Sequence, residues 1–262
     1  MKDQGYKYLF SNFMRNDDLA KSMINILNSI PKDQKPNLIA VFEAQDVFGK
    51  ENSEYGLKAA AANGYKVMSL KYTRFTKDLS AQILEAKRAG ADMMYGGMLQ
   101  PDGILLMKQI KELDYNPKII IIHGAAADST AWGSLGSDGN YVLAGAHFHW
   151  SFTYPGAQEL SALFQAEYKE KPWESSGAAY ANILILADAI KRAGTLNRSK
   201  IRDAIATTDM MTVVGPLKFT ENGTSIVDPV LLQWQNGNEE LVWPENLRTK
   251  PLIYPIPTWK ER

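Results

Sequence analysis

The chain has 262 residues, equal numbers of basic and acidic side chains at 29 each, and no cysteine. This charge balance gives no electrostatic support for a nucleic-acid surface, and the lack of cysteine excludes disulfides, thiolate nucleophiles and most structural zinc sites. No apolar run approaches the roughly 18 residues that a membrane span requires, and the N-terminal residues do not resemble a signal peptide. The composition is typical of a charge-balanced α/β protein.

Four units of strand followed by helix occupy the first half of the chain. The expected strands are residues 37–42, 66–72, 91–95 and 118–122. A helix is expected after each strand: the first ends at Asn63-Gly64, the second ends at Gly90, the third spans about 101–113 and the fourth lies near 129–135. Strands that are apolar on both faces, alternating with amphipathic helices, predict a parallel sheet covered on both sides. Right-handed crossovers place the strand-to-helix loops at one edge, where open α/β sheets bind ligands. That edge would carry residues 46–49, 97–100 and 123–126.

The helix before Gly90 shows the local signals most clearly. Asp78 and Ser80 stand at its start, and Lys87 and Arg88 lie in its last turn. A helix prefers this order of charges because its free N–H groups face one end and its free carbonyls face the other. The same unit repeats along the chain, which favours a ligand-binding lobe over a catalyst.

The pattern changes after Tyr141. An aromatic connector at residues 147–155 leads to helices at about 156–171, 175–193 and 199–206, and residues 211–243 then become strand-like, with turns at 222–223 and 236–237. The helical group has broad apolar faces but almost no strand of its own, whereas layered domains need a sheet under such helices. That sheet is either made by another chain or missing from this one.

Several motifs, taken in order, resemble one family. They are residues 46–49 (Asp-Val-Phe-Gly), 75–79 with the helix and Asp92 beyond it, 95–97 (Tyr-Gly-Gly), 214–219 (Val-Gly-Pro-Leu-Lys-Phe) and 233–234 (Gln-Trp). In this order and spacing, the chain resembles the extracytoplasmic solute-binding proteins of ABC transporters, of the branched-chain amino acid/amide type with the type I periplasmic-binding fold. The resemblance covers nearly the whole chain and depends on the order of the motifs rather than on any single one.

The resemblance implies an α/β fold of two doubly wound lobes that the chain crosses three times, with ligand bound between them. Mapped here, the second lobe is residues 8–146 plus 226–248, residues 147–225 are the remaining part of the first lobe, and residues 249–262 form an extended tail. The family's opening segment, which supplies the first lobe's N-terminal sheet and a signal peptide, has no counterpart. We therefore expect an N-terminally truncated chain that holds only about half of the cleft.

Candidate ligand contacts follow from the sheet edge and from the resemblance. Phe48 matches a position where the family places an aromatic ring against the ligand, although a core ring at a helix entrance is equally compatible with the fold. Met98 and Gln100 follow Gly97 at the same edge. His123 and Ala125 follow the fourth strand, where amino-acid-binding members often carry a carboxylate for the ligand's ammonium group. Because burying an ammonium without a counter-charge costs several kcal/mol, the alanine favours an amide, a carboxylate or a neutral polar ligand over a leucine-like one.

Ser175 and Ser176 are the candidate contacts in the retained part of the first lobe. A serine pair before a helix is more often an N-cap, which is the alternative interpretation. A zinc site at the His147-x-His149 pair lacks a third ligand of suitable spacing, and no serine lies in a nucleophile elbow. The sequence therefore predicts neither enzyme activity nor a metal or cofactor.

The expected function is that of a substrate-binding component of an ABC importer, in the periplasm or otherwise outside the cytoplasm, with the signal peptide lost together with the opening segment. Its partners would be a small-molecule ligand and the membrane permease, with no nucleic acid, and a complete chain would be a monomer. Two alternatives remain open: a cytoplasmic amide or amino-acid sensor of the same fold, and a non-functional truncated remnant. An enzyme on a doubly wound sheet is a further rival, which would lose turnover when His123 is mutated.

Overall fold

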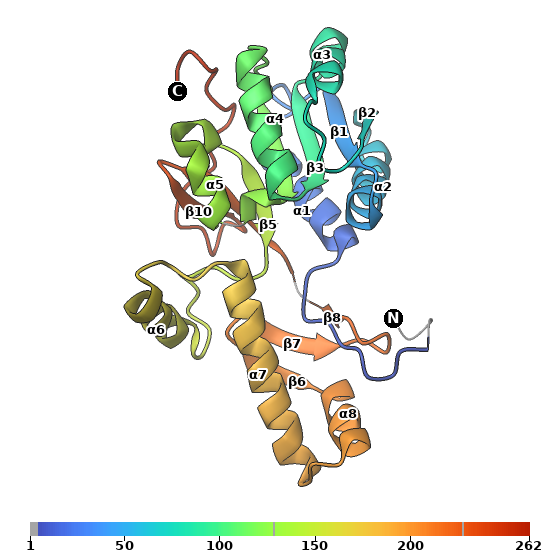
Figure 1. Cartoon of the computed structure of the whole chain (residues 1–262), viewed down its shortest axis with the longest axis vertical. Coiled ribbons are helices and arrows are strands. Elements are labelled where there is room, and N and C mark those ends of the chain that lie inside the picture. The colour runs from blue at the N-terminus through green and yellow to red at the C-terminus, as the bar shows by residue number, and fades with distance from the viewer. Residues whose placement is uncertain (1–4, 128, 227) are drawn as a thin grey trace. The chain divides into compact units, whose positions relative to one another are not determined.

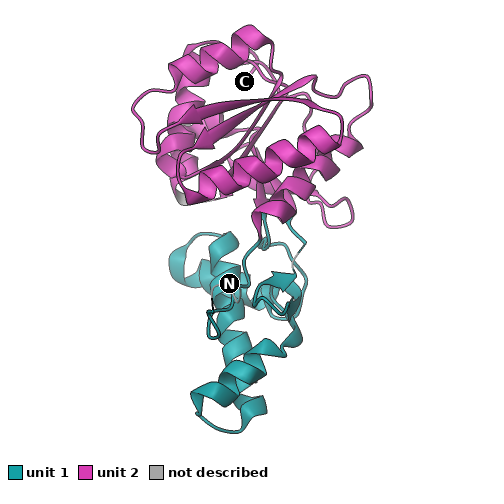
Figure 2. Cartoon of the chain, turned by 90° about the vertical axis from the view of Figure 1, so that its right-hand side faces the viewer, with its two compact units in different colours: residues 1–14, 146–229 teal, residues 15–145, 230–262 magenta. Residues whose placement is uncertain are grey.

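The structure is a computed structural model that describes residues 5–127, 129–226 and 228–262 (Figure 1). The chain divides into two compact units, which we call unit 1 (residues 1–14 and 146–229) and unit 2 (residues 15–145 and 230–262; Figure 2). The chain therefore passes between the units three times. Residues 8–14 group with unit 1 and residues 249–262 with unit 2, which differs from the boundaries expected above. The correspondence of the units to the two lobes of the family fold stays a prediction.

Unit 2 is built around a seven-stranded sheet with the strand order β10-β9-β5-β4-β3-β1-β2. Its strands are β1 (Leu38–Ala44), β2 (Lys66–Tyr72), β3 (Met93–Met98), β4 (Ile119–Gly124), β5 (Leu143–Ala146), β9 (Val230–Gln235) and β10 (Asn238–Trp243). Strands β2, β1, β3, β4 and β5 are successively parallel, whereas β9 and β10 pair antiparallel. The sheet is therefore mixed rather than parallel throughout, because β10 pairs antiparallel with β9. Both of these strands come from the second half of the chain.

The helices of unit 2 are α1 (Asn16–Ser29), α2 (Val47–Ala62), α3 (Ser80–Ala89), α4 (Gln100–Glu112) and the short α5 (Ser129–Trp132). Alternate residues of each strand point to opposite faces of the sheet. Phe42, Met94 and Ile122 therefore belong to one buried cluster with side chains of α3 and α4. Val41, Tyr95 and Ile121 belong to a second cluster with side chains of α1 and α2. This two-sided burial explains why these strands are apolar on both faces.

Local signals set the start of α2 and the end of α3, of which the end at Gly90 was expected from the sequence. Asp46 is the N-cap of α2, and its Oδ1 accepts a hydrogen bond from the Gly49 N–H at 3.0 Å. Gly90 ends α3 in the left-handed conformation, with φ of 71°. Helix α1 and strand β5 were not expected from the sequence.

Unit 1 contains α6 (Ala157–Tyr168), α7 (Glu174–Ala193) and α8 (Arg198–Ala206), together with a three-stranded antiparallel sheet of β6 (Asp209–Thr212), β7 (Gly215–Phe219) and β8 (Ser225–Ile226). Helix α8 has no buried residue. On α7, Ile183 is 65% exposed and Leu186 is 42% exposed. The small sheet therefore leaves much of the apolar surface of these helices uncovered within unit 1. None of the helices in the described residues combines the length and apolar content needed to cross a bilayer.

Candidate functional site

The candidate site in unit 2 lies at the carboxyl ends of β1, β3 and β4, which are neighbours in the sheet. Gly97 of β3 pairs with His123 of β4, so the loops that follow these two strands begin side by side. Gly124 has a φ of 87°, and a Cβ atom built there would lie 2.6 Å from the Met98 carbonyl oxygen and 3.5 Å from Cε1 of Phe48. The structure thus brings together the loops that carry Phe48, Met98 and His123.

The side chains at this edge differ in how far they reach the surface. Phe48 and Gln100 are partly exposed, Phe48 in the first turn of α2 and Gln100 as the first residue of α4. Met98 is 1% exposed and Ala125 is fully buried, and both belong to the cluster beneath α3 and α4. A Cβ atom at Gly103 of α4 would lie only 2.6 Å from the Ala125 Cβ. The roles of these four residues as ligand contacts stay predictions.

His123 is buried on the opposite face of the sheet from Met98. Its Nδ1 accepts a hydrogen bond of 3.0 Å from the Gly145 N–H, and its ring meets the Tyr95 ring edge-on with centroids 5.3 Å apart. Burial lowers the pKa of His123 to about 3, so the imidazole is neutral at physiological pH. Its Nε2 has no hydrogen-bond partner among the described residues. This geometry suits a residue that holds the end of β5 more than one that transfers a proton.

A polar group that the sequence analysis did not single out lies in the loop after β2. Arg74 Nε forms an ion pair of 2.8 Å with Asp46 Oδ2. The neighbouring Phe75 is 58% exposed with a φ of 60°, and its N–H donates to Asp102 Oδ1 at 2.9 Å. Asp102 is buried in the first turn of α4, and burial raises its pKa despite that hydrogen bond. The sheet-edge rule would have identified this loop as well, since β2 is parallel to β1.

The candidate residues in unit 1 lie in the first turn of α7. The helix begins at Glu174, and its N-cap is Trp173, which makes no side-chain cap. Neither Ser175 nor Ser176 is therefore the N-cap residue, so that alternative interpretation is wrong. Ser175 is exposed and Ser176 is partly exposed.

Beside these serines lies a buried pair of side chains that the sequence analysis did not find. Glu174 Oε1 is 2.9 Å from Nδ1 of His147, and the two side chains are 8% and 0% exposed. The Phe13 ring meets the His147 ring edge-on at 4.6 Å. The contact between His147 and Glu174 therefore holds the start of α7 within unit 1. Among the described residues, no three or more His, Asp or Glu side chains are grouped as a metal site would require.

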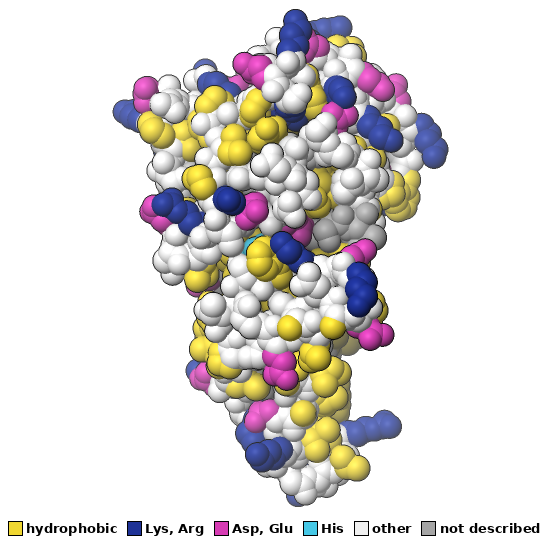
Figure 3. All heavy atoms as spheres, turned by 90° about the vertical axis from the view of Figure 1, so that its left-hand side faces the viewer, with side chains coloured by type: hydrophobic (Ala, Val, Ile, Leu, Met, Phe, Trp, Pro, Cys, Tyr) yellow, Lys and Arg dark blue, Asp and Glu magenta, His cyan; other side chains and the backbone are white. Residues whose placement is uncertain are grey.

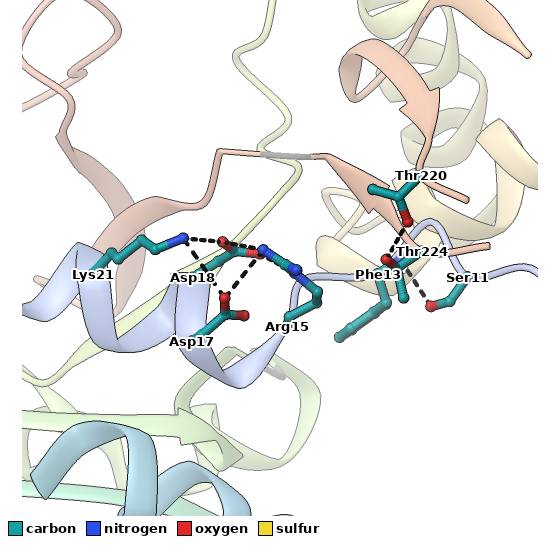
Figure 4. Close-up of polar contacts among 8 residues, drawn as sticks. All are labelled: Ser11, Phe13, Arg15, Asp17, Asp18, Lys21, Thr220 and Thr224. Atoms are coloured by element: carbon teal, nitrogen blue, oxygen red, sulfur yellow. Dashed lines mark hydrogen bonds and ion pairs between the residues drawn. The ribbon is translucent and has the colours of Figure 1, made fainter. Parts of the chain in front are cut away.

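The first passage of the chain between the units, at residues 14–15, has polar contacts within each unit (Figure 4). In unit 2, Arg15 donates to both carboxylate oxygens of Asp18 at 3.0 and 3.1 Å, and Lys21 Nζ lies 3.1 Å from Asp18 Oδ1. In unit 1, the hydroxyls of Thr220 and Thr224 lie 2.9 Å apart. The start of α1 is therefore held by a compact charge network.

The family model described as "Periplasmic binding protein" matches residues 2–239. The chain belongs to the periplasmic binding protein family. It is 25% identical over 265 residues to the Leu/Ile/Val-binding protein homolog 7 of Brucella suis biovar 1 (strain 1330), and the match covers 93% of this chain and 65% of that protein. Homolog 8 of Brucella abortus (strain 2308) is 24% identical, with 93% and 64% covered. The chain thus spans slightly less than two thirds of the length of these relatives.

Solved structures show the same fold. A leucine-binding protein of Thermotoga maritima MSB8 superposes with a TM-score of 0.83 at 22% identity, covering 91% of this chain and 68% of that one. A solute-binding protein of R. palustris in complex with benzoate gives a TM-score of 0.76 at 14% identity, covering 95% and 67%. The expectation of an α/β, type I periplasmic-binding fold, drawn from motif order, is confirmed.

Proposed function

We propose that the whole protein is the solute-binding component of an ABC importer, located outside the cytoplasm and without catalytic activity. Membership of the periplasmic binding protein family supports this proposal. The observation that carries it is that Phe48, Phe75 and Gln100 follow the carboxyl ends of the neighbouring strands β1, β2 and β3 and are at least partly exposed there, because open α/β sheets bind small molecules at this edge. The expected partners are a small ligand and the membrane permease.

The ligand class follows from the charges at this edge. Ala125, Ala126 and Ala127, which directly follow β4, are buried and carry no carboxylate, so the ammonium group of an amino acid placed against them would lack a counter-charge. Arg74, with a side chain 22% exposed, lies beside the exposed ring of Phe75. Because Arg74 is already paired with Asp46 and Asp102 lies nearby, its remaining N–H donors and the aromatic rings at this edge favour an amide or a neutral polar ligand. They favour a small or aromatic carboxylate only if it shares the guanidinium with Asp46. We assign Phe48, Gln100, Phe75 and Arg74 as contacts in unit 2, and ligand contact by Ser175 and Ser176 of unit 1 stays a prediction from the sequence.

Transport by this route requires two states of different ligand affinity. Ligand shifts a protein toward closure only to the extent that it binds the closed state more tightly. The three passages between the units, at residues 14–15, 145–146 and 229–230, are where backbone rotations would allow such a motion. The closed, liganded form would be the one that the permease recognises.

The test is calorimetric titration of the purified protein with a panel of amino acids, amides and aromatic carboxylates, combined with assays for turnover of each ligand. We expect saturable binding of an amide or carboxylate, unchanged ligand after incubation, and about tenfold or greater weakening on Phe48→Ala, since an aromatic contact is worth more than 1 kcal/mol in a closed site. Lys108→Ala, on an exposed position of α4, is the control and should bind normally. Turnover of a bound compound would refute the non-catalytic role.

A second hypothesis, a non-functional remnant, is favoured by one observation. Leu163, Ile183 and Leu186 are 58%, 65% and 42% exposed on α6 and α7. Exposed apolar side chains promote association when they form one patch. Concentration-dependent oligomers together with no binding across the panel would support the remnant, whereas a cooperative melt of a monomer that binds ligand would exclude it.

A further inference from the structure

A short basic segment stands out against the charge balance of the whole chain. Residues 191–203 include five basic side chains (Lys191, Arg192, Arg198, Lys200 and Arg202) and one acidic side chain, Asp203. The segment comprises the end of α7, the turn after it and the first turns of α8. We call it the basic turn. Since the whole chain has equal numbers of basic and acidic residues, the remainder carries the opposite excess.

Two of these cations already have partners, and three do not. Arg192 Nε pairs with Asp188 at 2.7 Å, and Arg202 pairs with Asp203. Lys191, Arg198 and Lys200 are exposed, and their side chains form no ion pair or hydrogen bond within the described residues. Basic residues at the C-terminal end of α7 interact favourably with the helix dipole. That explanation does not extend to Arg198 and Lys200, which lie in the first turn of α8, where the dipole disfavours positive charge.

Apolar surface accompanies these charges. Leu196 is 78% exposed in the turn between α7 and α8. A hollow of about 200 Å³ in unit 1 is lined by two of the basic side chains and by apolar ones, namely Tyr8, Phe10, Arg198, Ile201, Arg202 and Ile205. The Arg202 guanidinium lies over the Tyr8 ring, 5.1 Å from its centroid. In Figure 3, Lys and Arg side chains border hydrophobic ones at the lower end of the view, where α7 and α8 meet.

We propose that the basic turn, with Leu196 and this hollow, docks unit 1 on a membrane surface that contains anionic phospholipid. Cationic side chains near such a surface are attracted to it, and exposed apolar side chains among them enter the boundary between headgroups and acyl chains. A nucleic acid would match the charge but offers no environment for Leu196, Ile201 and Ile205. The docking surface is independent of the ligand site proposed for unit 2.

The test is co-sedimentation of the full chain with vesicles of phosphatidylcholine alone or of phosphatidylcholine mixed with phosphatidylglycerol. We expect binding only to the mixed vesicles, weakening at high salt. Arg198→Glu/Lys200→Glu should reduce the partition coefficient by about tenfold or more, because each cation near an anionic surface contributes about fivefold. Lys77→Glu/Lys108→Glu in unit 2 makes the same change of net charge at exposed, unpaired lysines and should bind like wild type. Leu196→Ser should reduce binding several-fold at every salt concentration.

Several outcomes would overturn the proposal. Equal binding to both vesicle types would contradict a role for the cations. Binding that is abolished by Ile183→Ser/Leu186→Ser but unchanged in the α8 charge variant would place the membrane contact on the apolar face of α7 instead. No binding to either vesicle refutes it outright, as does equal weakening by the two charge variants. Binding to polyglutamate but not to mixed vesicles would assign the surface to an acidic protein. Circular dichroism of each variant, unchanged from wild type, verifies that the fold survives, and Leu196→Ser remains a test if the charge variant does not fold.

Discussion

Unit 2 and unit 1 bury their helices to very different degrees. Two hydrophobic clusters of buried side chains lie in unit 2, one on each face of its sheet. In unit 1, α8 has no buried residue, and α7 exposes Ile183 and Leu186. Helix formation and helix burial are therefore separate in this chain, because both units form regular helices but only unit 2 encloses them against a large sheet. We therefore expect amide hydrogens of β1, β3 and β4 to exchange more slowly than those of α8.

The largest effect should come from truncating a side chain in the core of unit 2. Phe42 is fully buried in β1, so Phe42→Ala should lower the free energy of unfolding by about 3–5 kcal/mol. Leu186→Ala removes a half-exposed side chain in α7 and should cost less than about 1 kcal/mol. Urea denaturation of both variants measures the contrast, and equal losses would show that Leu186 is covered in solution.

A tightly packed seam in unit 1 should give the next largest effect. A Cβ atom at Gly177 of α7 would lie 2.1 Å from Cγ of Phe148, which is fully buried. Gly177→Ala should therefore destabilise the protein by about 1–3 kcal/mol through overpacking, although alanine favours helix. Gly133→Ala, where nothing lies within 4 Å, is the matched control and should be close to neutral. A neutral Gly177→Ala would mean that α7 shifts freely.

The charge network at the start of α1 should give a smaller and pH-dependent effect. Burial opposes ionisation of Asp18, but hydrogen bonds and charges from Arg15 and Lys21 outweigh it and hold the pKa of Asp18 below its ordinary value. A depressed carboxyl pKa contributes stability above the unfolded-state pKa of about 3.9, and this contribution is lost as pH falls through the lower folded-state pKa.

Asp18→Asn should consequently cost about 1–2 kcal/mol at neutral pH, and its difference from wild type should shrink on acidification. Thermal melts across a pH series measure this. A difference that stays constant with pH would show that Asp18 acts through packing alone. Asp17→Asn is the comparison, because Asp17 is more exposed, with 29% of its side chain accessible against 11% for Asp18.

The smallest effect concerns the cap of α8 in unit 1. The Asn197 side chain accepts a hydrogen bond of 3.2 Å from the Lys200 N–H. Asn197→Ala should cost about 0.5–1 kcal/mol, since a helix without buried residues contributes little beyond its own hydrogen bonds. Asn182→Ala, at an exposed position inside α7, should have the opposite sign because alanine has the higher helix propensity. A loss above about 2 kcal/mol at Asn197 would contradict the weak burial of α8.

Most elements could be predicted from the sequence, and the exceptions have physical causes. Strand β2 and helix α3 match their predicted extents closely because apolar periodicity, Asp78 and Gly90 are local signals. Helix α1 was not predicted, and its N-cap Arg15 makes no side-chain cap. Strand β5 consists of Leu143, Ala144, Gly145 and Ala146, small residues whose pattern does not favour a strand. It becomes one because β4 and β9 lie on either side of it.

The candidate site was predicted less completely than the fold. Topology identified the loops at Phe48, Met98 and His123, because the carboxyl ends of parallel strands share one edge. The ion pair between Arg74 and Asp46 connects the loops that follow two different strands, so no local sequence pattern predicts it. The pairing of His147 with Glu174 is likewise a contact between distant segments.

Periodicity, caps and motif order were enough to establish the type of most elements, their sequence along the chain and the family fold, because each of these depends on neighbouring residues. The environment of individual side chains was decided by tertiary packing and could not be predicted from these patterns. His123 is neutral because it is buried beside Tyr95 and Gly145, and Asp18 is held ionised by Arg15 and Lys21. Burial and charge depend on which segments meet in space, and strand order brings together residues that the chain keeps far apart.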